Sequence, residues 1–267
     1  MKKGISFYFG YVIDIEKRAE MIKNAGFDYV MTNQDPRFDE QNGTIETQIE
    51  LFKKYDLGVS SLHNQYKTSE LHNFWLDNEV GDKLEKQLID DIEVAGKYGF
   101  RCVVVHTIGE YSKIGENRLQ RVLKVCEEQN VPIAIENIDF QHPLIEIFEN
   151  ISHPYLKFCY DSGHNNCFDP DFDYLEKYGD KLICFHLHDN NGKADEHTLN
   201  KFGTINWEKI AKKISKLDLS NISLDYEMIM NNKNNTDENE CLDETIKQAN
   251  ELEKMILFYK NENWKQI

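Results

Sequence analysis

Eight short runs rich in Val, Ile, Phe and Tyr alternate along the chain with stretches of helical periodicity. Strict alternation of this kind indicates right-handed strand–helix–strand units and therefore a parallel sheet. Over 267 residues, eight such units predict an α/β fold, the (β/α)8 or TIM barrel, as a single domain spanning residues 1–267. An open doubly wound sheet is the alternative, which is disfavoured because no GxGxxG follows the first run. The predicted strands cover residues 4–9, 28–32, 58–63, 102–107, 132–137, 156–161, 182–189 and 222–227.

The stretches between these runs carry signals for helix ends. An amphipathic pattern that starts at Ile15 stops at Gly26, and a longer one that starts at Val80 stops at Gly99. A last helical pattern covers residues 243–260. The low-complexity stretch "NNKNNTDENE" at 231–240 precedes it and predicts a loop after the eighth strand.

Metal-binding side chains follow the predicted strands at the point where each strand ends. In a parallel barrel these carboxyl ends meet at one face, where active sites form. His164 follows the sixth strand at a distance of three residues, and Asp195 and His197 lie in the loop after the seventh. The side chains at the ends of six consecutive strands are His63, His106, Glu136, Asp161, His186 with His188, and Glu227.

Such a ring of carboxylates and imidazoles predicts a bound cation. Without one, the carboxylates would repel each other and their desolvated charges would be costly. A divalent metal removes both costs. Mixed Asp, Glu and His ligands suit Zn²⁺ or Mn²⁺, and also Co²⁺ or Fe²⁺, better than Ca²⁺ or Mg²⁺.

The charge of the chain restricts its partners. The formal net charge is −16 and the pI is near 5.0, so neither nucleic acid nor an anionic membrane is expected to bind. No run approaches the roughly 18 apolar residues of a membrane span, and residues 1–10 lack the apolar core of a signal peptide. Six cysteines without a CxxC pair predict buried free thiols in a reducing compartment. The expected location is the cytoplasm.

At these strand ends the sequence resembles the xylose isomerase-like barrels. This group includes the sugar phosphate isomerases/epimerases and the endonuclease IV class of enzymes acting on abasic DNA. The resemblance runs from the first strand to the last, and "DSGH" and "HLHDN…DEH…G…I-W" are its most specific parts. The motifs that carry it are "SLHNQY", "VVVHTIGE", "IAIENID", "YDSGHNNCF", "CFHLHDNNGKADEH" with "FGTINW", and "LDYE".

The resemblance implies roles for individual residues. In the sugar enzymes one metal is held from strands five to eight, at positions that match Glu136, Asp161, His186 and Glu227 here. Their two glutamates also exchange protons with the substrate. His188 would then lie behind the ligands or contact the substrate, and the reverse assignment of the two histidines stays open. The larger ligand set of the endonucleases, which holds three zinc ions, matches His63, His106, His164, Asp195 and His197 in addition.

The resulting hypothesis is an isomerase or epimerase that moves a proton next to the carbonyl of a small sugar or sugar phosphate, through an enediolate. The aromatic side chains of Phe7, Tyr66 and Trp75 could stack on the sugar or simply pack in the barrel. A zinc phosphodiesterase acting on abasic DNA is the alternative from another class, disfavoured by acidic loops. A dehydratase or lyase acting on a cyclic polyol or keto-acid would use the same groups. The sequence is compatible with a homo-oligomer and does not determine the assembly.

Overall fold

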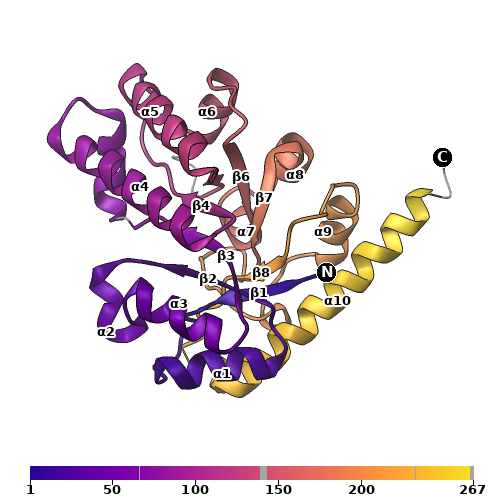
Figure 1. The fold of residues 1–267 in the computed structure, drawn as a ribbon. Coiled ribbons are helices and arrows are strands. Elements are labelled where there is room, and N and C mark those ends of the chain that lie inside the picture. Colours follow the sequence, from indigo (N-terminus) through magenta and orange to yellow (C-terminus); the bar gives the residue numbers. More distant parts are fainter. Residues whose placement is uncertain (66, 139–142, 232, 265–267) are drawn as a thin grey trace.

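Eight parallel strands form one sheet in a computed structural model that describes residues 1–65, 67–138, 143–231 and 233–264. The strand order is β7-β6-β5-β4-β3-β2-β1-β8. The sheet closes because Leu187, directly after β7, donates its N–H to the Asp225 carbonyl at 2.9 Å and accepts from Glu227 N at 3.0 Å. The predicted TIM barrel is therefore confirmed (Figure 1). The strands are β1 Lys3–Ser6, β2 Tyr29–Asn33, β3 Gly58–His63, β4 Cys102–Val105, β5 Ile133–Glu136, β6 Leu156–Asp161, β7 Leu182–His186 and β8 Leu224–Tyr226.

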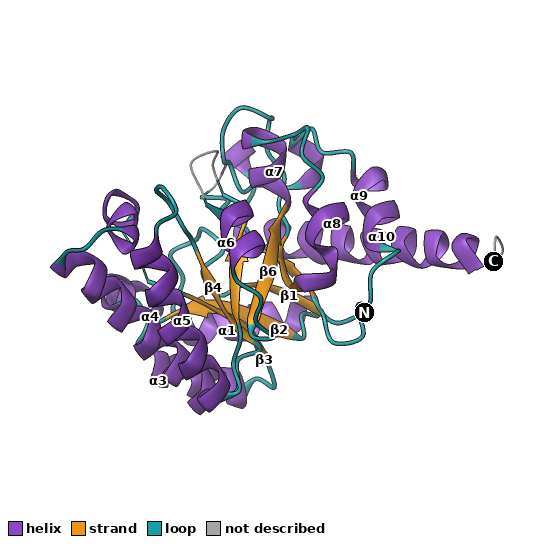
Figure 2. Cartoon of the chain, turned by 90° about the horizontal axis from the view of Figure 1, so that it is seen from above, coloured by secondary structure: helices purple, strands orange, loops and turns teal. Residues whose placement is uncertain are grey.

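Helices surround this sheet as an outer layer (Figures 1 and 2). The helix predicted from residue 15 ends at Ala25, and the helix predicted from residue 80 ends at Tyr98, each directly before its glycine. The long final helix packs on α1 and α9 and extends past the barrel at its C-terminal end (Figure 2). The helices are α1 Ile15–Ala25, α2 Asp39–Asn42, α3 Ile45–Lys54, α4 Glu79–Tyr98, α5 Lys113–Gln129, α6 Leu144–Asn150, α7 Ser162–Phe168, α8 Tyr174–Tyr178, α9 Trp207–Ile214 and α10 Glu238–Trp264.

One loop prediction needs correction, and one short helix was not predicted. The segment at 231–240 was expected to be a loop throughout, but α10 already begins at Glu238, because Asp237 accepts hydrogen bonds from the N–H groups of Asn239 and Glu240. The connection after β3 contains a short 3-10 helix, η2, at Thr68–Trp75. Its residues lack the 3.6-residue periodicity by which a helix is predicted. Further 3-10 turns are η1 Pro36–Phe38, η3 Gly179–Lys181, η4 Asn200–Phe202 and η5 Lys233–Asn235.

Small buried residues fill the barrel interior beneath the strand ends. Cys102, Val104, Ala134, Cys159 and Cys184 form a separate buried cluster. Alternate residues of a strand face the same side, so Ala134, Cys159 and Cys184 lie one step below the residues that end β5, β6 and β7. This layer supports the side chains above it. All six cysteines are free. Five of them are buried, as predicted, whereas Cys167 is half-buried.

The described part of the chain contains no helix that combines the length and the apolar character needed to cross a bilayer.

Asp189 organises the long loop after β7. Its Oδ1 accepts hydrogen bonds from the N–H groups of Asn190, Thr204 and Ile205 at 2.8–3.0 Å, and its Oδ2 accepts from the Trp207 indole at 2.7 Å. One buried carboxylate therefore satisfies four donors that are up to 18 residues away. This network explains the spacing of the "HLHDN…G…I-W" motif.

We expect Asp189→Ala to lower the free energy of unfolding by about 2–4 kcal/mol, because buried donors lose their acceptor. The matched control is Asp218→Ala. Asp218 also accepts from a backbone N–H, at Ser220, but it is exposed, so its loss should cost no more than about 0.5 kcal/mol. Urea unfolding of the two variants measures the difference. Equal midpoints for Asp189→Ala and the wild type would show that the loop does not depend on this carboxylate.

Candidate metal centre

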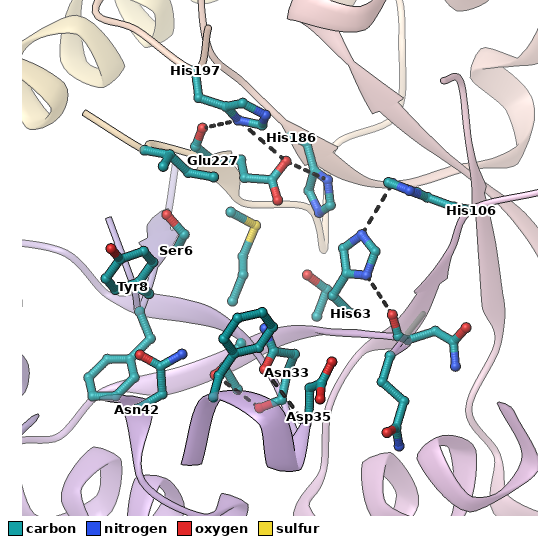
Figure 3. A pocket seen from close by; sticks show the side chains of 18 of the residues that line it. Ser6, Tyr8, Asn33, Asp35, Asn42, His63, His106, His186, His197 and Glu227 are labelled. Carbon is teal, nitrogen blue, oxygen red and sulfur yellow. Dashed lines mark hydrogen bonds and ion pairs between the residues drawn. The ribbon is translucent and has the colours of Figure 1, made fainter. Parts of the chain in front are cut away.

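The strand ends meet at one face of the barrel, as the sequence predicted. His63, Glu136, Asp161 and His186 are the last residues of β3, β5, β6 and β7. His106 follows β4 and Glu227 follows β8 directly. Figure 3 shows His63, His106, His186, His197 and Glu227 converging on one cavity.

Three groups of metal-binding side chains are present among the described residues, and two of them share residues. In each group, one ligand atom per residue lies within 4.8 Å of all the others. The groups are Glu136, Asp161, His186 and Glu227, hereafter the floor group; His63, Glu136 and His186, hereafter the wall group; and His164, His188, Asp195 and His197, hereafter the loop group.

The floor group centres on one imidazole nitrogen. His186 Nδ1 lies 3.2 Å from Glu136 Oε2 and 3.2 Å from Glu227 Oε2. Glu136 and Asp161 are fully buried, whereas the Glu227 side chain is 21% exposed. The two glutamates thus approach the same point, one from inside the barrel and one from the cavity.

The wall group adds His63 above Glu136, and His106 lies beside both of them. His106 Nε2 lies 3.1 Å from Glu136 Oε2 and 3.3 Å from His63 Nε2. His63 Nε2 itself is 3.6 Å from Glu136 Oε2. The same carboxylate oxygen therefore faces three imidazoles, those of His63, His106 and His186.

The loop group is built on the turn from β6 into α7. Asp161 ends β6 and caps α7 by accepting a hydrogen bond from His164 N at 2.6 Å, which places His164 over the barrel mouth. His164 Nε2 and His197 Nε2 then lie 3.3 and 2.9 Å from Asp195 Oδ2. His188 belongs to this group and not to the floor group, and its Nε2 lies 3.1 Å from Asp161 Oδ1.

The glycine of the "DSGH" motif is required by this packing. A Cβ atom on Gly163 would lie 1.9 Å from the His188 ring. Any larger residue would push His188 away from Asp161.

The histidines are oriented as metal ligands commonly are. In His63, His164 and His197 the Nδ1 atom faces a backbone carbonyl, and because a carbonyl only accepts, Nδ1 carries a proton and Nε2 is the nitrogen that can bind a metal. The Nδ1···O distances are 2.9 Å from His63 to Asn64, 3.0 Å from His164 to Asn137 and 2.9 Å from His197 to Glu227. In each case Nε2 turns toward a carboxylate. Glu136 Oε1 is buried, with His164 Nδ1 at 3.3 Å as a neighbour in poor hydrogen-bond geometry, so a cation would also satisfy this oxygen.

The charged groups at the site shift the pKa values of their neighbours. Burial raises the pKa of the Glu136 carboxyl, but the neighbouring rings of His186 and His106 hold it well below its ordinary value. Burial opposes protonation of His186, yet Glu136 and Glu227 raise its pKa well above the usual range. Asp195 likewise raises the pKa of His197 to about 9 against the effect of burial. Protons therefore occupy the places that a divalent cation would take.

A cavity of about 680 Å³ opens above the site. Its near wall consists of Glu227, Asp195 and the histidines at 63, 106, 164, 186 and 197. Glu136, Asp161 and His188 do not line the cavity and lie beneath it. Its far wall comes from the loops after β1, β2 and β3, with Ser6, Tyr8, Asn33, Asp35 and Asn42 visible in Figure 3.

The three aromatic residues expected to stack on a substrate have different positions. Phe7 lines the cavity but is almost fully buried, with its ring edge-on to Phe52 at 4.8 Å. Trp75 does not lie at the site, which corrects the expectation. It is 1% exposed and packs on Tyr111 at 5.3 Å, because η2 turns it toward α5. Tyr66 lies outside the described residues.

Two aromatic residues that line the cavity, Tyr8 and Phe38, were not predicted from the sequence. Tyr8 fell inside the predicted first strand, but β1 ends at Ser6 and the alternation of faces no longer applies after it. Phe38 lies in η1, for which the sequence signal was Asp35 as N-cap followed by Pro36.

The family model described as "Xylose isomerase-like TIM barrel" matches residues 19–252 of the chain. Among curated proteins, the chain is similar to "Uncharacterized protein y4fM" of Sinorhizobium fredii, with 36% identity over 97 residues. That match covers 34% of this chain and 31% of the relative, so it spans less than a third of the relative's length.

Solved structures share the whole fold. A "D-tagatose 3-epimerase-like protein" superposes with a TM-score of 0.73 and 23% identity, over 98% of this chain and 99% of that one. The IolI protein, solved "with a binding zinc atom", superposes with a TM-score of 0.71 and 16% identity, over 97% of this chain and 99% of that one.

Proposed function

The chain belongs to the xylose isomerase-like TIM barrel family, and from this premise we propose that it is a divalent-metal-dependent isomerase or epimerase of a small carbohydrate. The reaction would move a proton at a carbon next to a carbonyl group. The observation that carries the proposal is the floor group, in which Glu136 and Glu227 lie 3.2 Å from the same nitrogen of His186 at the base of the cavity.

The floor group fits one divalent metal with an oxygen-rich ligand set. Zn²⁺ and Mn²⁺ fit best, and Co²⁺ or Fe²⁺ would also be accepted. When bound, such an ion supplies electrophilic stabilisation to the carbonyl and hydroxyl oxygens of the substrate. The proposed ligands are Glu136, Asp161, His186 and Glu227.

The two glutamates are proposed to carry the proton. Glu227 is partly exposed and lines the cavity, so it can reach a bound sugar directly. Glu136 is buried below the rings of His63 and His106, and the neighbouring imidazoles keep its carboxylate ionised, so it is in the form that can accept a proton. We propose that Glu227 and Glu136 remove and return the proton from different sides, and separate variants test each role.

The cavity favours a neutral carbohydrate over a phosphodiester. Hydroxyl and amide groups, such as those of Ser6, Asn33 and Asn42, line the wall opposite the site. Arg37 and Lys67 are the cationic side chains among the described lining residues. Arg37 is ion-paired with Asp35, and Lys67 lies 3.3 Å from Glu70. Nucleic acid binding depends on many phosphate contacts, so this lining supports a sugar as substrate and disfavours abasic DNA.

Hydrogen exchange at carbon tests the proposal. The metal-loaded protein is incubated in D2O with a panel of ketoses and their phosphates, and products are examined by NMR and mass spectrometry. We expect one deuterium at the carbon next to the carbonyl in both the epimerised or isomerised product and the recovered substrate. Loss of water from the substrate would show a dehydratase, and cleavage of an abasic oligonucleotide with no exchange in any sugar would show a phosphodiesterase.

The number of bound ions follows from how the groups overlap. The floor and wall groups share His186, and one imidazole nitrogen binds one ion, so these two groups are expected to hold a single metal between them. The loop group shares no residue with them and could hold a second. We therefore expect one or two ions per chain. Elemental analysis of protein dialysed against trace metal measures this number, and three tightly held ions would contradict it.

A further inference from the structure

A buried carboxylate on α4 contacts the loops that form the cavity wall. Asp91 is 0% exposed, although it lies on the helix face that carries Leu88, Ile92 and Ala95 into the core. Its Oδ2 accepts hydrogen bonds from Asn64 Nδ2 at 2.6 Å and from Gln65 N at 3.1 Å. Its Oδ1 accepts from the side-chain amides of Gln34 and, at 3.5 Å, Gln65.

These partners come from two loops at the barrel mouth. Gln34 follows β2 directly, and Asn64 and Gln65 follow β3 directly. All four donors are neutral amides, so no counter-ion among them explains why a carboxylate is buried here. Asn64 and Gln65 line the cavity, whereas Asp91 does not.

One peptide unit connects Asp91 to the candidate metal centre. Gln65 N–H and the Asn64 carbonyl belong to the same peptide group, and in a trans peptide these two bonds point in opposite directions. The N–H is bound by Asp91 at 3.1 Å, and the carbonyl oxygen lies 2.9 Å from His63 Nδ1. Asp91 therefore fixes one end of a rigid plane whose other end receives the proton of His63.

We propose that Asp91 is a positioning residue that holds His63 in the tautomer with its proton on Nδ1, so that Nε2 presents its lone pair on the side of Glu136 and His106. The inference rests on the proposed metal-dependent function. Its structural part, the orientation and tautomer of His63, applies to the metal-free protein as well. Without Asp91, the peptide between residues 64 and 65 could rotate, and Nδ1 would lose its acceptor.

The first test is the tautomer of His63, read by two-bond ¹⁵N–¹H NMR in metal-free protein. The wild type is expected to show the proton on Nδ1. In Asp91→Leu, which keeps the size of the side chain but accepts no hydrogen bond, we expect a mixture of tautomers. Asp91→Asn should restore the wild-type spectrum, because its oxygen can bind Asn64 and Gln65 while the amide of Gln34 turns over. A wild-type His63 with its proton on Nε2 would overturn the proposal even if Asp91→Leu did not fold.

The second test is the affinity for Co²⁺, followed by its visible absorption. Partners behind metal ligands typically contribute about 10–100-fold to metal affinity, and His63 belongs to the wall group, which is expected to share its ion with the floor group. We therefore expect Asp91→Leu to weaken Co²⁺ binding by about that factor and Asp91→Asn to stay within about threefold of the wild type. The matched control is Glu85→Leu. Glu85 is a nearly buried carboxylate on the same helix, but it pairs with Arg121, away from the site. This control should lose stability without loss of Co²⁺ affinity.

The outcomes separate the two proposals. A wild-type protein that binds no Co²⁺ and exchanges no sugar proton would contradict the proposed function, whatever the tautomer. Equal Co²⁺ affinity in the wild type and in Asp91→Leu, together with an unchanged His63 tautomer in that variant, would contradict only the positioning role. Equal losses in Asp91→Leu and Glu85→Leu would show that Asp91 acts through general stability alone.

Discussion

Turnover is expected to fall by at least about a hundredfold when either Glu227 or Glu136 is replaced by glutamine. Glutamine keeps the shape of the side chain but has neither the charge nor the basicity, and general acid–base catalysis typically contributes about 10²–10⁴-fold. Both variants should stay folded, because the residues that pack the barrel interior, such as Ala134 below Glu136, are unchanged. Steady-state kinetics together with circular dichroism measure the two effects separately.

Excess metal distinguishes a ligand from a proton carrier. Saturating Mn²⁺ or Zn²⁺ should fill the metal site of either variant without restoring turnover. Glu93→Gln, at an exposed position of α4, is the control and should turn over as the wild type does. Recovery of near-wild-type turnover in Glu136→Gln would mean that this buried glutamate is only a ligand, and that Glu227 needs a different partner for the proton. The same recovery in Glu227→Gln would mean that Glu227 is only a ligand, and recovery in either variant would contradict the two-carboxylate mechanism.

Removing the metal is the second change with a large expected effect. Electrophilic stabilisation by a bound ion contributes several kcal/mol, and each ~1.36 kcal/mol is tenfold in rate, so dialysis against a chelator should lower turnover by about a thousandfold or more. Adding back Mn²⁺ or Zn²⁺ should restore it, whereas Mg²⁺ should restore it poorly. Full activity in protein shown by elemental analysis to hold no transition metal would contradict metal dependence.

The pH dependence of metal binding has a defined sign. The carboxylates around His186 raise the pKa of its ring, and Asp195 raises the pKa of His197 to about 9, in each case against the effect of burial. These rings carry protons at neutral pH in the metal-free protein, and the protons must leave before nitrogen binds a cation. Binding should therefore release protons and strengthen as the pH rises from about 6 toward about 9. Calorimetry in buffers of different ionisation enthalpy measures the release, and a value of zero at about pH 7 would contradict the assigned charges.

The barrel and the position of the site followed from the sequence because both depend on simple periodicities. Alternation of strands and helices defines the fold, and the rule that parallel strands end at one face brings His63, Glu136, Asp161, His186 and Glu227 together. Their convergence needs no knowledge of side-chain conformation. It needs only approximate strand ends. The predicted ends of β3 and β6 agree with the structure, whereas those of β5 and β8 lie one residue too late and that of β7 three residues too late.

The division of these residues into groups did not follow from the sequence. His186 and His188 are two residues apart, and only the bridge at Leu187 and the path of the following loop place His188 beside Asp161 and not beside Glu227. Trp75 was misplaced because η2 lacks the 3.6-residue periodicity that would have revealed its direction. Asp91 was not among the predicted site residues. Its position on the same helix face as Leu88 and Ile92 nevertheless indicates a buried carboxylate that needs a partner.

The most direct test of the central claim is the position of a metal in the protein itself. Crystals grown with Zn²⁺ are measured on both sides of the zinc absorption edge, and the anomalous difference map locates the ion. We predict the strongest peak between Glu136, Asp161, His186 and Glu227, at about 2.0–2.2 Å from one atom of each. A well-ordered crystal of metal-replete protein with no peak there, and with these four side chains pointing away from any common point, would contradict the account.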